Sequence, residues 1–449
     1  MAARAAGRLS RMLGRGDGHA LPGRIVERLD PQAMSGLARQ LPGGVVLVTG
    51  TNGKTTTTRL IVAGLTAAGE QVVTNRTGSN MRQGILAALL AACDRHGRLH
   101  GTIGVFEVDE ATVRQVTGAL SPRLVVVLNL FRDQLDRHAE LELVAERILE
   151  GLRGVDTRVL LNADDPLVAS LGRHLDPARV DFFGIEETAG LGSAQKPSDG
   201  ESDRCPRCGR PLLYSYVLFS QLGHYTCPSG DFRRPEVTAC VTRTGTASAG
   251  GQPFVMRMDG KPQAARTSSP GTYSIYNAVA ALAACSLLGT DPAVAAPAVA
   301  SCGPAFGRSE EFELDGMRIR LLLVKNPTGS AQVISTFVAD DPTAPLLIAL
   351  NDAAADGRDV SWIWDCPLEL LGGRPGPVIA TGTRAGDLAL RLKYADVDAS
   401  VVVPLKRALA ELLTVDPEAR TGYVLATYTA MLALRREMLH RGADVQVAA

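Results

Sequence analysis

A glycine-rich turn joins an apolar strand to a helix near residue 50, and this arrangement is typical of one class of fold. Residues 43–50 read GGVVLVTG, which predicts a buried strand. Residues 55–69 read TTTTRLIVAGLTAAG, which predicts a helix that ends at a glycine. Further apolar runs alternate with helix-like stretches along the chain. We therefore expect an α/β fold with a parallel sheet.

The turn has the composition of a phosphate-binding loop. Backbone N–H groups at the N-terminus of a helix attract phosphate oxygens. Lys54 would reach the terminal phosphates of ATP, and the Thr55 hydroxyl would ligate Mg²⁺. The general P-loop pattern requires a glycine where this chain has Val48, so the loop is a variant form. The residues expected to bind the nucleotide are Gly50, Thr51, Asn52, Gly53, Lys54, Thr55 and Thr56.

The chain is expected to contain a terminal segment and two domains. Residues 1–43 form a basic N-terminal segment before the first strand. Residues 44–311 would form a central ATP-binding domain, with a small cysteine ribbon inserted at about 203–236. A fresh series of apolar strands and helices starts at residue 312, so residues 312–449 would form a second, Rossmann-like α/β domain.

Composition argues against several classes of function. The formal net charge is zero and 21% of the residues are charged, so we expect no nucleic-acid partner. No apolar run approaches the length of a membrane-spanning helix, and no signal peptide is visible, so we expect a cytoplasmic protein. The N-terminal segment is either a solvated end or a contact with the inner face of an anionic membrane. Its basic stripe consists of Arg4, Arg8, Arg11 and Arg15.

The phosphate loop is one of several motifs that resemble those of the Mur ligases and folylpolyglutamate synthases. GTNGKTT at residues 50–56 has the form found in that family, and further similar motifs follow in the same order. They are FEVDE (106–110), NLFRDQLDRH (129–138), LNADDP (161–166), YSIYNAVAA (273–281) and GRSEEF (307–312).

This resemblance implies roles for individual residues. Glu107 would hold Mg²⁺, Asn277 would touch the adenine of ATP, and Arg308 would approach its phosphates. A carboxylate at a strand end beside a phosphate loop also suits Mg²⁺ on chemical grounds alone. The other motif positions are matched without an implied contact, and they are Asn129, Asp133, Asp136, Asn162, Asp164 and Asp165.

The C-terminal series resembles one branch of the family, the MurT ligases. The segments at residues 350–365 and 380–395 are similar to the MurT C-terminal domain, and a cysteine ribbon in the central domain is a further likeness. Only about 43 residues precede the first strand, too few for the uridine-nucleotide domain of ordinary Mur ligases. The resemblance implies ATP-dependent amidation of the D-glutamate α-carboxyl of the lipid II stem peptide, through an acyl phosphate.

The same resemblance implies a partner subunit. A GatD-like glutamine amidotransferase would form a heterodimer with this chain and deliver ammonia to the lipid II substrate. In the family, the ligase subunit completes the partner's Cys-His pair with an aspartate, for which Asp356 and Asp359 are the candidates. We favour Asp359, which directly precedes a predicted helix, although it could instead simply cap that helix.

Two other functions are compatible with the motifs. A stand-alone ligase of the Mur or folylpolyglutamate type would use an amino acid as nucleophile and need no partner. A nucleotide-binding scaffold without catalysis is the other alternative, and the intact Lys54, Thr55 and Glu107 argue against it.

The cysteine ribbon lacks one ligand of a complete zinc site. Cys205, Cys208 and Cys227 have the spacing of a zinc ribbon, but Ser229 and Gly230 stand where the fourth ligand is expected. Asp231 is the substitute with the best spacing, and His224 and Cys240 are alternatives. A hairpin that has lost its metal is the other interpretation. In either case we expect the ribbon to be a structural insertion outside the chemistry.

Overall fold

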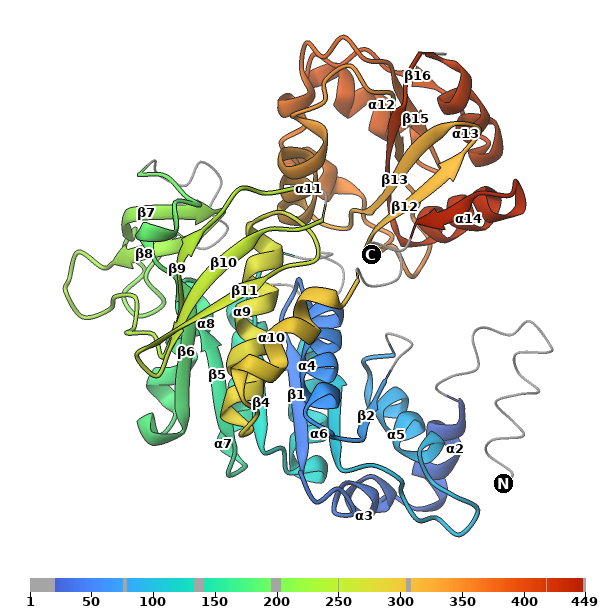
Figure 1. Cartoon of the computed structure of the whole chain (residues 1–449). Helices are drawn as coiled ribbons and strands as arrows, with labels where there is room; N and C mark the ends of the chain where they lie inside the picture. Colours follow the sequence, from blue (N-terminus) through green and yellow to red (C-terminus); the bar gives the residue numbers. More distant parts are fainter. Residues whose placement is uncertain are drawn as a thin grey trace. The chain divides into compact units, whose positions relative to one another are not determined.

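The structure is a computed structural model of the chain. It describes residues 21–75, 79–132, 141–194, 203–248, 250–303, 308–416 and 418–446. The basic stripe of the N-terminal segment, Asp133 and Asp136 therefore lie outside the described residues. The chain divides into two compact units, Met1–Phe131 with Glu140–Cys302 and Arg132–Ala139 with Gly303–Ala449 (Figure 1).

The first unit is built on a nine-stranded sheet with the order β11-β10-β9-β6-β5-β4-β1-β3-β2. The strands from β9 to β2 in this order are parallel, and β10 and β11 are antiparallel. Its central strands are buried and rich in valine, as expected for a sheet covered on both faces. The strands are β1 (Val45–Thr49), β2 (Val72–Thr74), β3 (Ile103–Glu107), β4 (Leu124–Val127), β5 (Arg158–Asn162), β6 (Val180–Ile185), β9 (Ala239–Thr244), β10 (Pro253–Met258) and β11 (Lys261–Arg266).

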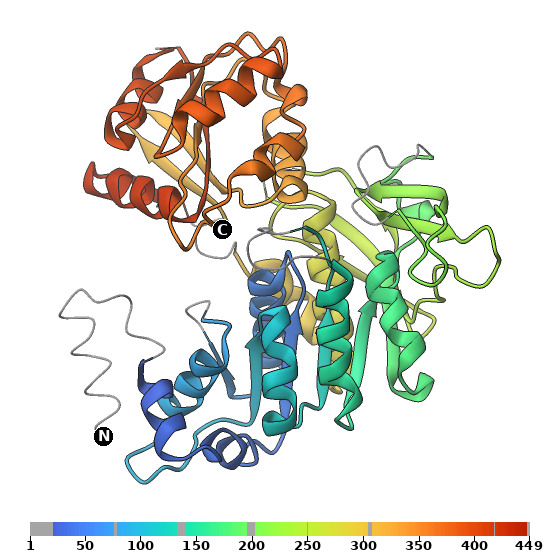
Figure 2. The same ribbon diagram turned by 180° about the vertical axis from the view of Figure 1, so that it is seen from behind.

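Helices cover both faces of this sheet, as the two views in Figures 1 and 2 show. One apolar core joins the sheet to α4 (Lys54–Ala67), α9 (Thr272–Leu287) and α10 (Pro292–Ser301). The other core lies on the opposite face, and its helices are α3 (Ala33–Ala38), α5 (Arg82–Ala91), α6 (Val113–Leu120), α7 (Leu141–Arg153) and α8 (Pro166–Leu171).

Part of the N-terminal segment belongs to this core. Helix α2 (Leu21–Leu29) packs against α5, and Met34 and Leu37 of α3 are buried. The sequence patterns did not reveal these two short helices, because each offers only a few apolar positions. The described part of the segment is therefore integrated into the first unit rather than separate from it.

The cysteine ribbon forms a separate two-stranded hairpin, β7 (Leu213–Phe219) and β8 (Leu222–Thr226). The next segment of the chain also folds as a hairpin, in which β9 pairs with β10, and β9 pairs in parallel with β6, so this hairpin extends the main sheet. Local sequence patterns cannot show that β6 is the neighbour of β9, because the two strands are far apart in the chain.

The second unit is a smaller α/β structure with a seven-stranded sheet in the order β16-β15-β14-β17-β13-β12-β18. Strands β16, β15, β14, β17 and β13 are parallel to one another. β12 pairs antiparallel with β13, and β18 pairs antiparallel with β12 at the edge of the sheet. β12 starts four residues before the expected boundary at 312 and pairs with β13, so it belongs to this unit. The strands are β12 (Arg308–Leu314), β13 (Met317–Leu323), β14 (Leu346–Ala349), β15 (Val378–Thr381), β16 (Ser400–Val401), β17 (Thr421–Ala426) and β18 (Asp444–Gln446). The helices are α11 (Pro327–Val333), α12 (Ala385–Tyr394), α13 (Leu405–Thr414) and α14 (Tyr428–His440). The predicted α/β class is confirmed, and both sheets are mostly parallel.

Candidate active site

The phosphate loop lies between the carboxyl end of β1 and the first residue of α4. Gly50 and Gly53 both have positive φ angles, 129° and 87°, which favour glycine. A Cβ atom on Gly53 would lie 2.2 Å from Asn277 Oδ1, so only glycine allows this close approach. The loop can therefore turn its backbone toward a phosphate at the N-terminus of a 14-residue helix.

Lys54 is held in place by its own loop and by an acidic residue. Its Nζ atom donates to Gly50 O at 2.5 Å and to Thr51 O at 3.3 Å. It also forms a 3.0 Å ion pair with Glu110, and the two side chains are only 9% and 7% exposed. Glu110 was not among the residues predicted to act at the site. It is the second glutamate of the FEVDE motif, but the spacing of the motif does not indicate which of its acidic side chains pairs with Lys54.

Thr55 and Glu107 meet beside this pair, and their binding of Mg²⁺ stays a prediction. Thr55 Oγ1 donates to Glu107 Oε2 at 2.7 Å, and Asn80 Nδ2 approaches Glu107 Oε1 at 3.4 Å. Asn75 bonds both to Glu107 N and to Glu107 O, which fixes the end of β3. A hydroxyl and a carboxylate in contact are hard oxygen donors of the kind that Mg²⁺ prefers, so these residues fit the implied ion.

The motif segment after β4 braces the phosphate loop. Asn129 accepts from Asn52 N at 2.8 Å and donates to Asn52 O at 3.1 Å, and its own carbonyl accepts from Thr51 N. Thr51 Oγ1 exchanges hydrogen bonds with the backbone of Phe131 at 3.0 and 3.1 Å. The side chain of Thr51 and the backbone of Asn52 are thus fixed from outside the loop.

The two aspartates of LNADDP are buried and structural. Asp165 accepts from Leu130 N at 2.9 Å and caps α8, and burial raises the pKa of its carboxyl to about 6. Asp164 accepts from Arg234 Nε at 2.5 Å and from Tyr276 at 2.6 Å. Asn162 donates to Leu128 O at 2.9 Å. These residues tie β5 to its neighbours, and none of their described contacts reaches the loop directly.

Asn277 lies against the loop, on the second turn of α9. Its Oδ1 accepts from Thr57 Oγ1 at 3.2 Å and faces Gly53. A contact with adenine stays a prediction. Thr56 lies in the first turn of α4. Arg308 begins β12, and its side chain lies outside the described residues, so its approach to phosphate also stays a prediction.

The cysteine cluster includes one carboxylate. Ligand atoms of Cys205, Cys208, Cys227 and Asp231 all lie within 4.8 Å of one another. Asp231 Oδ1 is buried and has no hydrogen-bond partner among the described residues, an arrangement that a cation would satisfy. Three thiols and a carboxylate are a suitable donor set for zinc.

Other hydrogen bonds involve the Cys208 thiol and the alternative ligands. The hydrogen bond with Ser229 lowers the pKa of the Cys208 thiol to about 7. The two alternative ligands lie elsewhere: His224 bonds to Ile185 O at 2.8 Å, and Cys240 accepts from Arg257. Of the three substitutes considered, only Asp231 joins the cysteines.

Asp356 and Asp359 occupy different environments in the second unit. Asp356 is 4% exposed and accepts from Thr429 N at 2.7 Å, so it caps the first turn of α14. Asp359 is half-buried and accepts from Ser361 N at 2.8 Å, before the short helix Ser361–Asp365. This backbone bond lowers the pKa of the Asp359 carboxyl.

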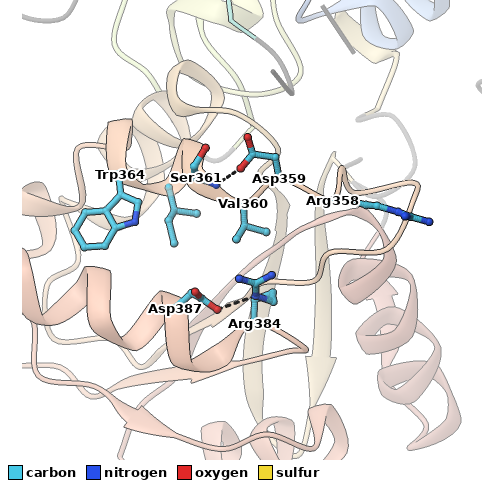
Figure 3. Close-up of a pocket in the computed structure, with 8 residues that line it drawn as sticks. Arg358, Asp359, Val360, Ser361, Trp364, Arg384 and Asp387 are labelled. Atoms are coloured by element: carbon cyan, nitrogen blue, oxygen red, sulfur yellow. Dashed lines mark hydrogen bonds and ion pairs between the residues drawn. The ribbon is translucent and has the colours of Figure 1, made fainter. Parts of the chain in front are cut away.

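Asp359 also lines a pocket of about 290 Å³ (Figure 3). Arg384 lies in the same pocket and bonds to Asp387 at 2.7 Å. The remaining lining residues are Arg358, Val360, Ser361, Ile363 and Trp364. Asp359 is therefore the accessible member of the two candidates, and Asp356 is held in the interior.

Comparisons with known proteins follow this division of the chain. The family model described as "Mur ligase middle domain" matches residues 48–204, and the one described as "MurT ligase C-terminal" matches residues 323–431. A "Lipid II isoglutaminyl synthase (glutamine-hydrolyzing) subunit MurT" from Streptococcus pneumoniae is 33% identical over 429 residues, covering 95% of this chain and 93% of that protein. The chain belongs to the MurT family. The subunit of the same name from Staphylococcus aureus is also 33% identical, over 98% of this chain and 96% of that protein.

Solved structures show that the fold of this MurT chain is shared with other ligases. A pseudomurein peptide ligase type C from Methanothermus fervidus superposes with a TM-score of 0.69 at 21% identity, covering 89% of this chain and 78% of that one. The predicted resemblance to the MurT branch is confirmed. No helix among the described residues is both long and apolar enough to span a membrane.

Proposed function

We propose that this chain is the ATP-dependent ligase subunit of a lipid II isoglutaminyl synthase. It would convert the D-glutamate α-carboxyl of the lipid II stem peptide to the amide, in the synthesis of peptidoglycan. The observation that carries the proposal is the similarity to MurT subunits along almost the whole chain. The cluster of Lys54, Thr55 and Glu107 at the loop supports the use of ATP.

The reaction would proceed in two steps. The substrate carboxylate attacks the γ-phosphorus of ATP, the bond to the β-phosphate oxygen breaks, and an acyl phosphate and ADP result. Ammonia then attacks the acyl carbon, phosphate leaves with the C–O electron pair, and a proton is lost from nitrogen to leave the amide. Lys54 and Arg308 would offset the charge of the transferring phosphoryl group. Thr55 and Glu107 would hold Mg²⁺, which would supply positive charge beside the phosphates.

Ammonia would come from a GatD-like glutamine amidotransferase subunit in a heterodimer. Free ammonia is scarce at neutral pH, and the relatives are named as subunits of a glutamine-hydrolysing synthase. Asp359 would complete the partner's catalytic triad, because its carboxyl is ionised at neutral pH and accessible from a pocket. An ionised carboxylate orients a histidine and stabilises its cation.

Two further assignments belong to the proposal. Zinc would bind Cys205, Cys208, Cys227 and Asp231 and close the ribbon. The enzyme would work in the cytoplasm, peripherally at the inner face of the membrane, because its lipid II substrate is embedded there.

The experiment that tests the function is ATP turnover with lipid II and glutamine, with and without the partner subunit. With glutamine, amide product should form only when both subunits are present, and ammonium chloride should replace glutamine and the partner together. Product formation with a free amino acid as nucleophile, and without a partner, would instead identify a stand-alone ligase. Absence of ATP turnover under all these conditions would contradict both.

A further inference from the structure

The tip of the ribbon hairpin reaches the residues that hold the phosphate loop. Gln221, at the turn between β7 and β8, is fully buried and donates from Nε2 to Leu130 O at 2.9 Å. Ser220 precedes it in the left-handed region, with a φ of 49°, and donates to Gln221 Oε1 at 2.7 Å. Tyr214 donates to Gln221 O at 2.9 Å. The turn is therefore fixed, and the side-chain amide of Gln221 is directed at the main sheet.

Leu130 lies in the segment that braces the loop. Its neighbour Asn129 bonds to both backbone groups of Asn52, and its other neighbour Phe131 bonds twice to Thr51 Oγ1. The carbonyl that receives the Gln221 hydrogen bond is thus placed between two direct contacts to the phosphate loop. A shift of this carbonyl would move both contacts.

Phe219 connects the same segment to α9. Its ring lies 6.1 Å from the ring of Phe131 and 5.9 Å from the ring of Tyr276, the latter edge to face. Tyr276 is buried and directly precedes Asn277, whose side chain faces Gly53 of the loop. The Phe219 ring therefore packs between two segments that each contact the loop.

Other bonds make the hairpin continuous with the sheet. Gly223 N donates to Asp164 O at 2.9 Å, and Tyr225 donates to Ala163 O at 2.9 Å. Arg234, near the end of the ribbon, pairs with Asp164, which also accepts from Tyr276. Because these polar contacts are buried, water does not compete for them, and they restrict motion of the tip.

We infer that Phe219 and Gln221 are positioning residues for the nucleotide site, which they adjust through Phe131, Leu130 and Tyr276. The inference rests on the proposed ATP site. It revises the expectation that the ribbon lies outside the chemistry. The cysteine end of the ribbon is distant along the hairpin from this tip, so the metal cluster and the tip have separable roles.

Binding of MgATP to the full chain, measured by calorimetry without lipid II, tests this role. Phe219→Ala removes the ring contacts, and Gln221→Met removes the donor at nearly constant length. We expect the Kd for MgATP to rise about tenfold in each variant, the size of effect that one aromatic pair or one buried hydrogen bond has. In steady state the KM for ATP should rise while the KM for glutamine stays constant.

Controls separate positioning from folding. Leu213→Ala changes the same hairpin at a side chain that is 61% exposed, and its Kd should match that of the wild type. Phe219→Tyr keeps the ring and should retain most of the affinity. If Phe219→Ala fails to fold, Gln221→Met carries the test alone. A folded variant that binds MgATP like the wild type, even with a lower kcat, would overturn the inference.

The outcome also distinguishes this inference from the proposed function. If the wild type does not bind MgATP, or if Lys54→Ala binds it equally well, the proposed nucleotide site is wrong. If Lys54→Ala loses affinity but the two hairpin variants do not, the site stands and the positioning role fails.

Discussion

At the scale of single residues, Lys54 has a partner that must be considered in any mutagenesis. Its ammonium is nearly buried and paired with Glu110. Removing one member of a buried ion pair leaves an uncompensated charge, which typically costs about 3–5 kcal/mol of stability. A loss of activity in a Lys54 variant therefore needs a control that restores the charge balance.

We expect Lys54→Ala to abolish amidation, because no other described side chain at the loop offers an ammonium to the transferring phosphoryl group. The double variant Lys54→Ala/Glu110→Gln should recover thermal stability but not activity. Product formation from lipid II, measured with ammonium chloride, checks both. Near-normal turnover in either folded variant would remove Lys54 from the chemistry.

Glu110→Gln alone should lower the ammonium-dependent kcat by roughly tenfold, because the side chain that fixes Lys54 loses its charge. The effect should depend on Lys54. In the double variant, the Glu110 substitution should cause no further loss of activity beyond that of Lys54→Ala. Independent, additive losses would show that Glu110 acts through another group.

Asp165 gives a pH dependence of stability. Burial raises the pKa of this carboxyl from 3.8 to about 6. The folded state therefore holds the proton more tightly than the unfolded state, so the stabilisation is complete below pH 3.8 and is lost as the pH rises through 6. Between pH 5 and 7.5, the free energy of unfolding should fall by about 1.5 kcal/mol relative to Asp165→Asn. Urea denaturation of both proteins across this range checks the sign, and an opposite slope would contradict it.

At the scale of elements, the two ends of the ribbon have different proposed roles: the cysteine end would bind zinc, and the tip would position the nucleotide site. We expect about one zinc per chain in purified protein, since four donor atoms are gathered at the cysteine end. Cys205→Ser should lose the metal and lower the Tm by at least about 5 °C. Cys240→Ser, a buried cysteine outside the cluster, is the matched control and should keep the zinc. No zinc after expression in zinc-supplemented medium would remove the site.

Sequence patterns were sufficient to predict elements whose interaction partners lie close by in the chain. The strand, glycine turn and helix around residue 50 were predicted because their residues act locally, and Glu107 followed from its place at a strand end. The ion pair with Glu110 was not predicted, because it depends on how a short turn after β3 is directed. The contact of Phe219 with Phe131 and Tyr276 joins positions far apart in the sequence, and no spacing rule can indicate it.

At the scale of the whole molecule, the residues proposed for the reaction belong to both units. Lys54, Thr55 and Glu107 lie in the first unit, and Arg308 and Asp359 lie in the second. The proposed roles predict that defects at the phosphate loop and at Asp359 will respond differently to ammonia supplied from solution.

We expect Asp359→Asn to block glutamine-dependent amidation and to be rescued by ammonium chloride, because the ligase site is untouched. Lys54→Ala should not be rescued. Asp356→Asn should mainly lower stability, since its carboxylate is buried at the start of α14. A rescued phenotype in Asp356→Asn, with normal glutamine use in Asp359→Asn, would reverse the assignment of the two residues.

The pocket beside Asp359 has a pharmacological consequence. It has a volume of about 290 Å³ and is lined by two arginines, two aspartates and a tryptophan, which would give a small molecule both charged and aromatic contacts. Under the role proposed for Asp359, a compound bound there would stop the use of glutamine while sparing the ATP-dependent step. Its antibacterial effect should therefore weaken in media rich in ammonium, a simple growth assay that would distinguish it from an inhibitor competing with ATP.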